Sequence, residues 1–195
     1  METNGIENMS QPVHIGLVGM GTVGTGVVRV LQDSADHIAK QAGRPLLVEH
    51  VVVQNLKKPR SVELTGKQIS NDLAKITEDQ EIRVVAVLLG GLEPARTICL
   101  ELLRSGKDLV TANKALLAEH GPELFQVARE AGRSIAFEAA IGGGIPIVAA
   151  VSECLTGNQI SSIRGILNGT SNFILTKMEQ DGSDYHDVLA LAQAE

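Results

Sequence analysis

Aromatic side chains are almost absent from this sequence, which has 3 Phe, 1 Tyr and no Trp in 195 residues. Because 44% of its residues are nevertheless apolar, the core must consist of Val, Ile, Leu and Ala, the usual interior of a parallel sheet covered by helices. The cysteines are also few. Cys99 and Cys154 form no CxxC pair and each lies among apolar residues, which favours buried free thiols over a disulfide or a cysteine nucleophile.

Long apolar runs and basic patches are missing as well. The longest weakly polar stretch, 139–151, is rich in glycine and shorter than the ~20 residues that a membrane span needs. The first twelve residues lack the apolar core of a signal peptide. The net charge is −6, and no basic stripe interleaved with aromatics is present. We therefore expect a soluble, cytoplasmic protein that binds neither membranes nor nucleic acid.

Segments with strand and helix patterns alternate along the chain, which predicts βαβ units and a parallel sheet. The predicted strands are 13–18, 46–54, 82–89, 108–111, 134–137 and 160–167. The predicted helices are 22–41, 93–105, 116–131 with a break allowed at Gly121-Pro122, 147–155, and 171 to the end. The polar segment 55–71 is expected to be a loop, and the glycine-rich segment near residue 145 a hinge between domains 1–145 and 146–195.

A glycine-rich turn, GMGTVG, follows the first predicted strand and opens the first predicted helix. It fits the G-x-G-x-x-G pattern of dinucleotide-binding proteins. In that pattern Gly19 permits the tight turn, Gly21 lets a pyrophosphate approach the backbone, and Gly24 lets helix and strand pack closely. The amides of Thr22 and Val23 would supply donors to the anion. The alternative is a tight βα turn with no ligand.

The end of the second predicted strand bears on the choice of dinucleotide. An acidic residue there would bind the ribose hydroxyls of NAD, but this strand ends at Gln54-Asn55. Lys57, Lys58 and Arg60 follow, and their charges could pair with a 2′-phosphate. The sequence therefore favours NADP over NAD, with a solvated basic loop as the alternative.

Three further motifs follow the glycine turn, namely VTANK (110–114), EAAIGGGIP (138–146) and RGILNGTSNFIL (164–175). With these motifs in this order, the chain closely resembles the homoserine dehydrogenase family from residue 14 to the end. The resemblance implies an α/β fold with a Rossmann-type parallel sheet domain, followed by the beginning of a second α/β domain for catalysis and dimerisation. It implies NAD(P)-dependent interconversion of L-aspartate 4-semialdehyde and L-homoserine, in threonine and methionine biosynthesis, by a homodimer.

The resemblance also implies roles for individual residues. Lys114 would be catalytic and face both nicotinamide and substrate, whereas the residues alone favour a solvated charge at a strand end. The cofactor would contact Gly19, Gly21, Thr22, Val23, Gly24, Gln54, Lys57, Gly90, Gly91 and Lys114. The substrate would contact Gly169 and Thr170, for which a helix N-cap is the compatible alternative. A monovalent cation, sodium, would be bound by the Glu138 carboxylate and the carbonyls of Ile141, Gly143 and Ile145.

The chain departs from the family pattern in three respects. Family members often carry an acidic residue just before the Gly-Gly pair, where this chain has Val87-Leu88-Leu89. The Arg-Asp common at the end of the second strand is replaced by Gln54-Asn55, which leaves the cofactor preference open. The second catalytic lysine of the family lies in a D-x-x-x-K segment beyond a G-Y-x-E stretch, and these 195 residues contain no G-Y-x-E stretch followed by such a segment. We therefore expect an N-terminal part of a longer enzyme that is inactive by itself. The competing hypothesis is a non-catalytic dinucleotide-binding module.

Overall fold

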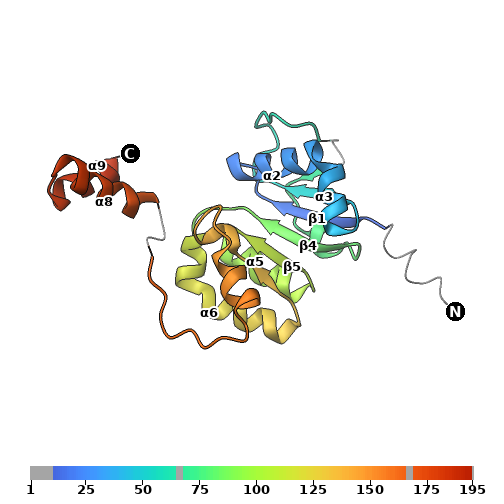
Figure 1. Ribbon diagram of the computed structural model, residues 1–195. Helices are drawn as coiled ribbons and strands as arrows, with labels where there is room; N and C mark the ends of the chain where they lie inside the picture. Colours follow the sequence, from blue (N-terminus) through green and yellow to red (C-terminus); the bar gives the residue numbers. More distant parts are fainter. Residues whose placement is uncertain (1–10, 65–67, 166–168, 195) are drawn as a thin grey trace. The chain divides into compact units, whose positions relative to one another are not determined.

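The computed structural model describes residues 11–64, 68–165 and 169–194, which form two compact units, Met1–Phe137 and Glu138–Glu195 (Figure 1). The strands of the first unit are β1 (Val13–Val18), β2 (Leu46–Val52), β3 (Ile69–Ser70), β4 (Ile82–Val87), β5 (Asp108–Thr111) and β6 (Ile135–Ala136). Its helices are α2 (Thr22–Asp33), α3 (Ala35–Ala42), α4 (Ala74–Thr77), α5 (Ala95–Arg104) and α6 (Lys114–Ala131). The second unit contains η1 (Glu138–Ala140), α7 (Ile147–Ala149), η2 (Ala150–Cys154), α8 (Gly169–Asp181) and α9 (Tyr185–Ala194).

The described strands of the first unit form one six-stranded sheet in the order β3-β2-β1-β4-β5-β6. All of the pairings are parallel. After β3 the chain crosses to the other side of β1, so the strand order reverses between β1 and β4. Val18 and Val87, near the carboxyl ends of these two strands, are neighbours. This parallel strand order confirms the predicted Rossmann-type architecture. Ligands of open α/β sheets bind at such a reversal, which indicates where the site lies.

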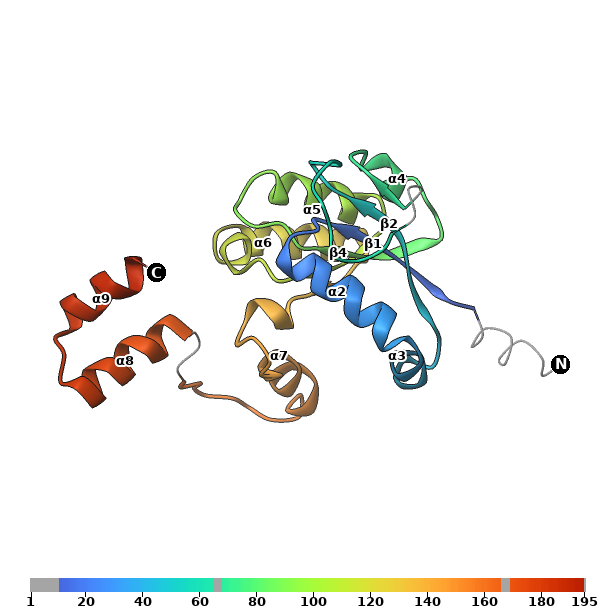
Figure 2. The same ribbon diagram turned by 90° about the horizontal axis from the view of Figure 1, so that it is seen from above.

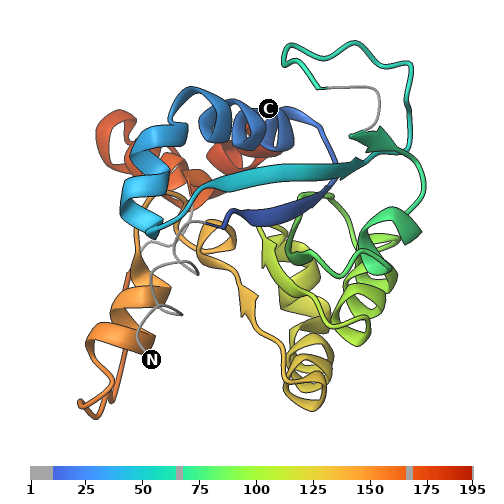
Figure 3. The same ribbon diagram turned by 90° about the vertical axis from the view of Figure 1, so that its right-hand side faces the viewer.

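Helices cover both faces of this sheet, with α2 and α3 on one side and α5 and α6 on the other (Figures 1 and 3). The alternation of side chains along the strands explains the two layers. Leu17 of β1 and Ala86 of β4 pack with Val28 of α2, whereas the next residues along each strand, Val18 and Val87, pack with α5 and α6. Aliphatic side chains fill both layers, as the shortage of aromatic residues predicts.

Several predicted elements differ from the structure in the first unit. The helix predicted over 22–41 is divided at Ser34, whose backbone (φ −114°, ψ 22°) is not helical. The break allowed at Gly121-Pro122 is absent, and α6 runs through both residues. Leu116 and Leu124 are buried on either side of the proline, and their packing holds the helix continuous. The short elements β3 and α4 were not predicted, since each is too short to show a periodic pattern.

In the second unit, the helix predicted over 147–155 is present as α7 followed by the π-helical η2. The strand predicted over 160–167 is wrong for residues 160–165, which form neither strand nor helix, while 166 and 167 lie outside the described residues. Ile160 and Ile163 are 42% and 59% exposed, so their apolar pattern is not buried as a strand's would be. Helices α8 and α9 contact each other (Figure 2). No helix among the described residues is long and apolar enough to cross a membrane.

Candidate dinucleotide-binding and active site

The glycine turn after β1 is held by the neighbouring strands. Gly19 donates its N–H to the carbonyl of Val52 at 2.9 Å, and Leu88 donates to the carbonyl of Val18 at 2.8 Å. Gly19 has φ +93°, a left-handed conformation that L side chains rarely adopt. A Cβ at this position would also lie 2.9 Å from the carbonyl oxygen of Leu88. The turn therefore requires glycine at its first position.

The other two glycines have different surroundings. A Cβ on Gly24 would lie 2.3 Å from the carbonyl oxygen of Gly19, so α2 can pack this closely against the turn only with glycine there. A Cβ on Gly21 would meet nothing within 4 Å. The space beside Gly21 is therefore open to a ligand, as expected where a pyrophosphate approaches the backbone.

The start of α2 provides hydrogen-bond donors next to that space. Gly21 is the N-cap, and no side chain caps the helix. The first bond of the helix runs from the Thr25 N–H to the carbonyl of Gly21, which leaves the amides of Thr22 and Val23 without a partner inside the helix. Uncapped amides at the positive end of a helix dipole bind anions. The turn and the helix therefore fit a pyrophosphate.

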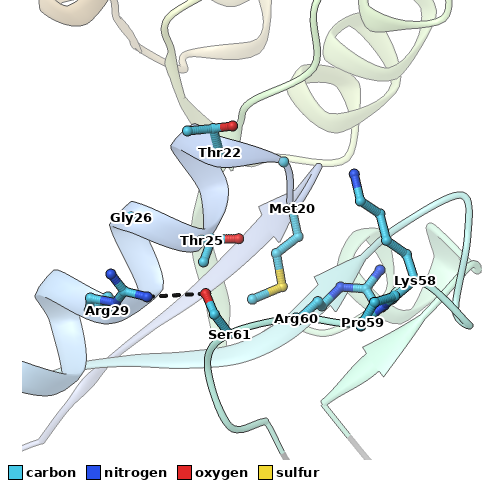
Figure 4. A pocket seen from close by; sticks show the side chains of 10 residues that line it. Met20, Thr22, Thr25, Gly26, Arg29, Lys58, Pro59, Arg60 and Ser61 are labelled. Atoms are coloured by element: carbon cyan, nitrogen blue, oxygen red, sulfur yellow. Dashed lines mark hydrogen bonds between the residues drawn. The ribbon is translucent and has the colours of Figure 1, made fainter.

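A hollow of about 450 Å³ lies on one side of this helix start (Figure 4). It is lined by Met20, Gly21, Thr22, Thr25, Gly26, Arg29, Lys58, Pro59, Arg60 and Ser61. The residues of α2 that line the hollow are spaced three and four apart, which places them on one face of the helix. Arg29 donates from Nη2 to Ser61 Oγ at 3.1 Å and so links the helix to the loop after β2. Three cations, Arg29, Lys58 and Arg60, therefore border this hollow.

The guanidinium of Arg60 organises the loop after β2. Nη1 donates to the carbonyl of Lys58 at 2.8 Å, and Nη2 donates to the carbonyl of Asn55 at 2.7 Å. These bonds hold the loop in the form that brings Lys58 to the hollow. Gln54 and Lys57, which we predicted as cofactor contacts, are exposed and are not part of the lining. Arg29 was not predicted, although its spacing of seven residues from Thr22 places both on one face of the helix.

A second hollow, of about 330 Å³, lies on the other side of the helix start. It is lined by Val23, Leu88, Leu89, Gly90, Gly91, Ala112, Asn113, Lys114 and Ala115. The structure thus brings together four of the predicted contacts, Val23, Gly90, Gly91 and Lys114, and adds Asn113. Both hollows lie where the strands end, one beyond β2 and the other beyond β4 and β5. A dinucleotide with its pyrophosphate at the start of α2 would have one half on each side.

Lys114 is exposed, and it is the first residue of α6. No acidic residue occupies the first turn of that helix. A cation at the positive end of a helix dipole is unfavourable by about 0.3–1 kcal/mol, so stability alone would favour an acidic residue at this position. Its ammonium group has no hydrogen bond or ion pair among the described residues. Stability therefore does not explain the placement of Lys114 on the wall of the second hollow.

In the second unit, the Glu138 carboxylate is bound by the backbone. Oε1 accepts from the N–H of Val148 and Oε2 from the N–H of Ala149, each at 2.9 Å. Glu138 therefore fixes the glycine-rich loop to the start of α7, a contact that the sequence analysis did not foresee. Its other lone pairs are compatible with the predicted cation, although the carbonyl of Ile145 already accepts from the Ile147 N–H at 2.8 Å. The described residues contain no group of three or more His, Cys, Asp or Glu side chains that could hold a metal ion.

The predicted substrate contacts are the first two residues of α8. Gly169 and Thr170 are both exposed. Their amides belong to the first turn of a helix, which agrees with either a ligand contact or the helix start named as the alternative. The roles assigned to them stay predictions.

The cysteines provide no nucleophile. Burial raises the pKa of the Cys99 thiol to about 12, so the thiol stays protonated at neutral pH. Cys154 is exposed, so the expectation that both thiols are buried is wrong for Cys154. It lies on η2, a five-residue helix in which no residue is buried. Neither cysteine lines either hollow.

Comparison with known proteins agrees with this geometry. Residues 19–138 match the family model described as "Homoserine dehydrogenase, NAD binding domain", and residues 146–195 match the model described as "Homoserine dehydrogenase". The homoserine dehydrogenase of Synechocystis is 46% identical over 185 residues, which are 93% of this chain and 41% of that protein. The Bacillus subtilis enzyme is 42% identical over 181 residues, 93% of this chain and 42% of that protein.

A solved structure supports the same assignment. The chain superposes on a homoserine dehydrogenase from Thiobacillus denitrificans with a TM-score of 0.83 and 44% identity, over 95% of this chain and 43% of that one. This chain thus spans about two fifths of the length of the relatives that it matches. The chain belongs to the homoserine dehydrogenase family of NAD(P)-dependent oxidoreductases.

Proposed function

We propose that the full-length protein interconverts L-aspartate 4-semialdehyde and L-homoserine, as a cytoplasmic homodimer in threonine and methionine biosynthesis. The observation that carries this proposal is the pair of hollows flanking the start of α2, with Lys114 on the wall of one and three cations bordering the other. Membership of the homoserine dehydrogenase family argues against the alternative of a non-catalytic binding module. The boundary between domains 1–145 and 146–195 belongs to the same proposal.

In this mechanism the first unit binds and orients the reactants. The amides at the start of α2 hold the pyrophosphate, and the open face of Gly21 admits it. When bound, the nicotinamide accepts or returns the hydride of the carbon that carries the substrate oxygen. Lys114, at the edge of the second hollow, orients that oxygen and shares in the transfer of its proton. The substrate also contacts Gly169 and Thr170, and Glu138 with its glycine-rich loop binds a sodium ion.

The test of the catalytic role is Lys114→Ala in the full-length protein. We expect kcat/KM to fall by about 10²-fold or more, the scale of one acid–base group. Stability should change by no more than about 0.5 kcal/mol, because the side chain is exposed. Lys114→Arg should not restore turnover, since a guanidinium is larger and stays protonated. Lys40→Ala, which removes an exposed lysine from α3, is the matched control and should keep wild-type kinetics.

Three results are distinguishable in this experiment. Slow turnover by Lys114→Ala with a normal thermal midpoint supports the proposed role. Wild-type turnover by Lys114→Ala would reject it. Dinucleotide binding by a full-length protein that turns over neither substrate would favour the non-catalytic module.

The proposed cofactor preference is for NADP. It is supported by the absence of an acidic residue after β2 and by the three cations at the first hollow, Arg29, Lys58 and Arg60. Lys58→Ala should weaken NADPH binding by about tenfold and leave NADH binding nearly unchanged, because NADH has no 2′-phosphate. Lys57→Ala is the matched control, since that lysine adjoins Lys58 but does not line the hollow. Tighter binding of NADH than of NADPH by the unmodified protein would contradict the proposal.

A further inference from the structure

Asn113 joins the two walls of the second hollow. Its side-chain Nδ2 donates to the carbonyl of Leu89 at 3.0 Å and to the carbonyl of Gly91 at 2.6 Å. Its Oδ1 accepts from the N–H of Leu116 at 3.0 Å. One wall of the hollow is the turn after β4, and the other is the start of α6. A single side chain is thus bonded to both walls.

The direction of the Asn113 amide follows from these partners. In the opposite orientation, Oδ1 would face two carbonyl oxygens and the NH₂ group would face an N–H, so only the observed orientation satisfies all of the bonds. Asn113 is 8% exposed, which leaves water little access to replace a lost partner. These three hydrogen bonds therefore require an amide side chain at position 113, with its NH₂ group toward the turn and its oxygen toward the helix.

The backbone of Asn113 extends the same network. Its N–H donates to Thr111 Oγ1 at 3.2 Å, and that hydroxyl donates to the carbonyl of Val87 at 3.1 Å. The ends of β4 and β5 are therefore linked to each other as well as to the turn and the helix. Thr111 is also buried, at 2% exposure.

Lys114 directly follows Asn113. Because the Lys114 ammonium has no side-chain partner among the described residues, its position depends on the backbone at the start of α6. That backbone is fixed by the Asn113 side chain, which caps the helix through Leu116. The turn on the opposite wall, with Gly90 and Gly91, is fixed by the same amide.

We propose that Asn113 is a positioning residue, which holds Lys114 at a set distance from the Gly90-Gly91 turn by clamping that turn to the start of α6. This inference rests on the proposed function, because Asn113 can affect turnover through Lys114 only if Lys114 has its proposed catalytic role. The clamp itself is a property of the first unit and can be tested without turnover.

The first test measures the clamp in the full-length protein by hydrogen exchange. Asn113→Asp keeps an acceptor for the Leu116 N–H but replaces both donors, and Asn113→Ser keeps a capping hydroxyl that is too short to reach the turn. In both variants we expect exchange in a peptide covering residues 88–96 to accelerate by about threefold or more. Ile76→Val, a core change on α4, controls for a general loss of stability. Unchanged exchange in both Asn113 variants would overturn the clamp, whatever the activity.

The second test is a double-mutant cycle on kcat. Asn113→Asp should lower kcat by about tenfold or more when Lys114 is present, since small misplacements of reacting groups have large effects. In a Lys114→Ala background the same change should cost less than about threefold, because the residue that it positions is gone. If the kcat losses of the two single variants multiply in the double variant, Asn113 does not act through Lys114, and the positioning role is wrong. Asn113→Ser repeats the cycle without a new charge and decides the result if the Asp variant does not fold.

Failure of the proposed function gives a different pattern. If the full-length protein does not oxidise L-homoserine, the proposed function and the positioning role both fail, while the exchange measurement still decides whether the clamp exists. If Lys114→Ala has normal kinetics but Asn113→Asp is slow, the positioning role is overturned and the enzyme activity stands.

Discussion

Replacing Gly24 by alanine tests whether the glycine turn is as tightly built as the structure indicates. A Cβ on Gly24 would lie 2.3 Å from the carbonyl oxygen of Gly19 and 3.2 Å from its carbonyl carbon. Cβ atoms in proteins almost never come within 3.0 Å of another heavy atom, so the turn and α2 would have to separate by about 0.7 Å. The obstacle is backbone, which cannot rotate away as a flexible side chain can.

The turn cannot relax easily. Gly19 is in a left-handed conformation and is bonded through its N–H to Val52. Such overpacking costs about 1–3 kcal/mol, which corresponds to a fall in the thermal midpoint of roughly 3–10 °C for a chain of this size. Thermal and denaturant unfolding of Gly24→Ala, followed by circular dichroism, would measure it. NADPH binding should weaken in parallel, because the displaced helix carries the anion-binding amides.

Gly26 supplies a matched control in the same helix. A Cβ there would meet nothing within 4 Å, so Gly26→Ala adds no clash and removes the entropic cost of a helical glycine. We expect it to stabilise the protein by about 0.5–1 kcal/mol. A Gly24→Ala variant as stable as the wild type, or two variants that shift stability in the same direction, would refute the argument from close packing.

Other substitutions test the anion site, a buried lysine and a surface ion pair. Gly21→Ala should change the free energy of unfolding by no more than about 0.5 kcal/mol and weaken the binding of NADPH, measured by fluorescence titration, by about tenfold. Unchanged affinity would mean that no phosphate approaches Gly21. Lys107 is 2% exposed and donates to the backbone carbonyls of Asp79 and Ile82. Lys107→Met should therefore lower the free energy of unfolding, measured in urea, by about 1.5–3 kcal/mol. An unchanged unfolding midpoint would contradict this. The hydrogen bond from Arg96 lowers the pKa of Glu123 below 4.5, so its stabilisation is present above that pH and is lost as the pH falls through the folded-state pKa. Glu123→Gln should reduce the drop in thermal midpoint between about pH 7 and about pH 3, and an equal drop in both proteins would show that the pair contributes nothing.

The sequence determines the first unit well because its strands alternate between two buried layers and its helices are long enough to show a stripe. Val13–Val18 and Asp108–Thr111 were predicted with the bounds that the structure has. The predictions failed where a tertiary contact outweighs the local pattern, as at Pro122, or where an apolar pattern has no strand to pair with, as at 160–165. Four-residue elements such as α4 carry too little periodicity to be predicted.

The candidate site was predictable to the extent that it depends on backbone conformation. Glycines reveal a turn because only they fit it, so Gly19 and Gly24 could be assigned roles from the sequence. The contacts that Asn113 and Arg29 make could not be predicted, because their partners lie 22–24 and 32 residues away in the chain. The partners of the Glu138 carboxylate, ten and eleven residues further along, were hidden for the same reason.

The two hollows share only the start of α2, and this separation has a consequence for how the protein can change. The loop after β2 borders the first hollow and is held by bonds from Arg60 to its own carbonyls and from Arg29 to Ser61. The walls that carry Lys114 are held by Asn113, with no contribution from that loop. Substitutions in residues 54–61 can therefore shift the choice between two coenzymes while the reacting groups stay in register. Under the proposed function, coenzyme choice and chemistry are therefore separately mutable traits, open to selection or redesign one at a time.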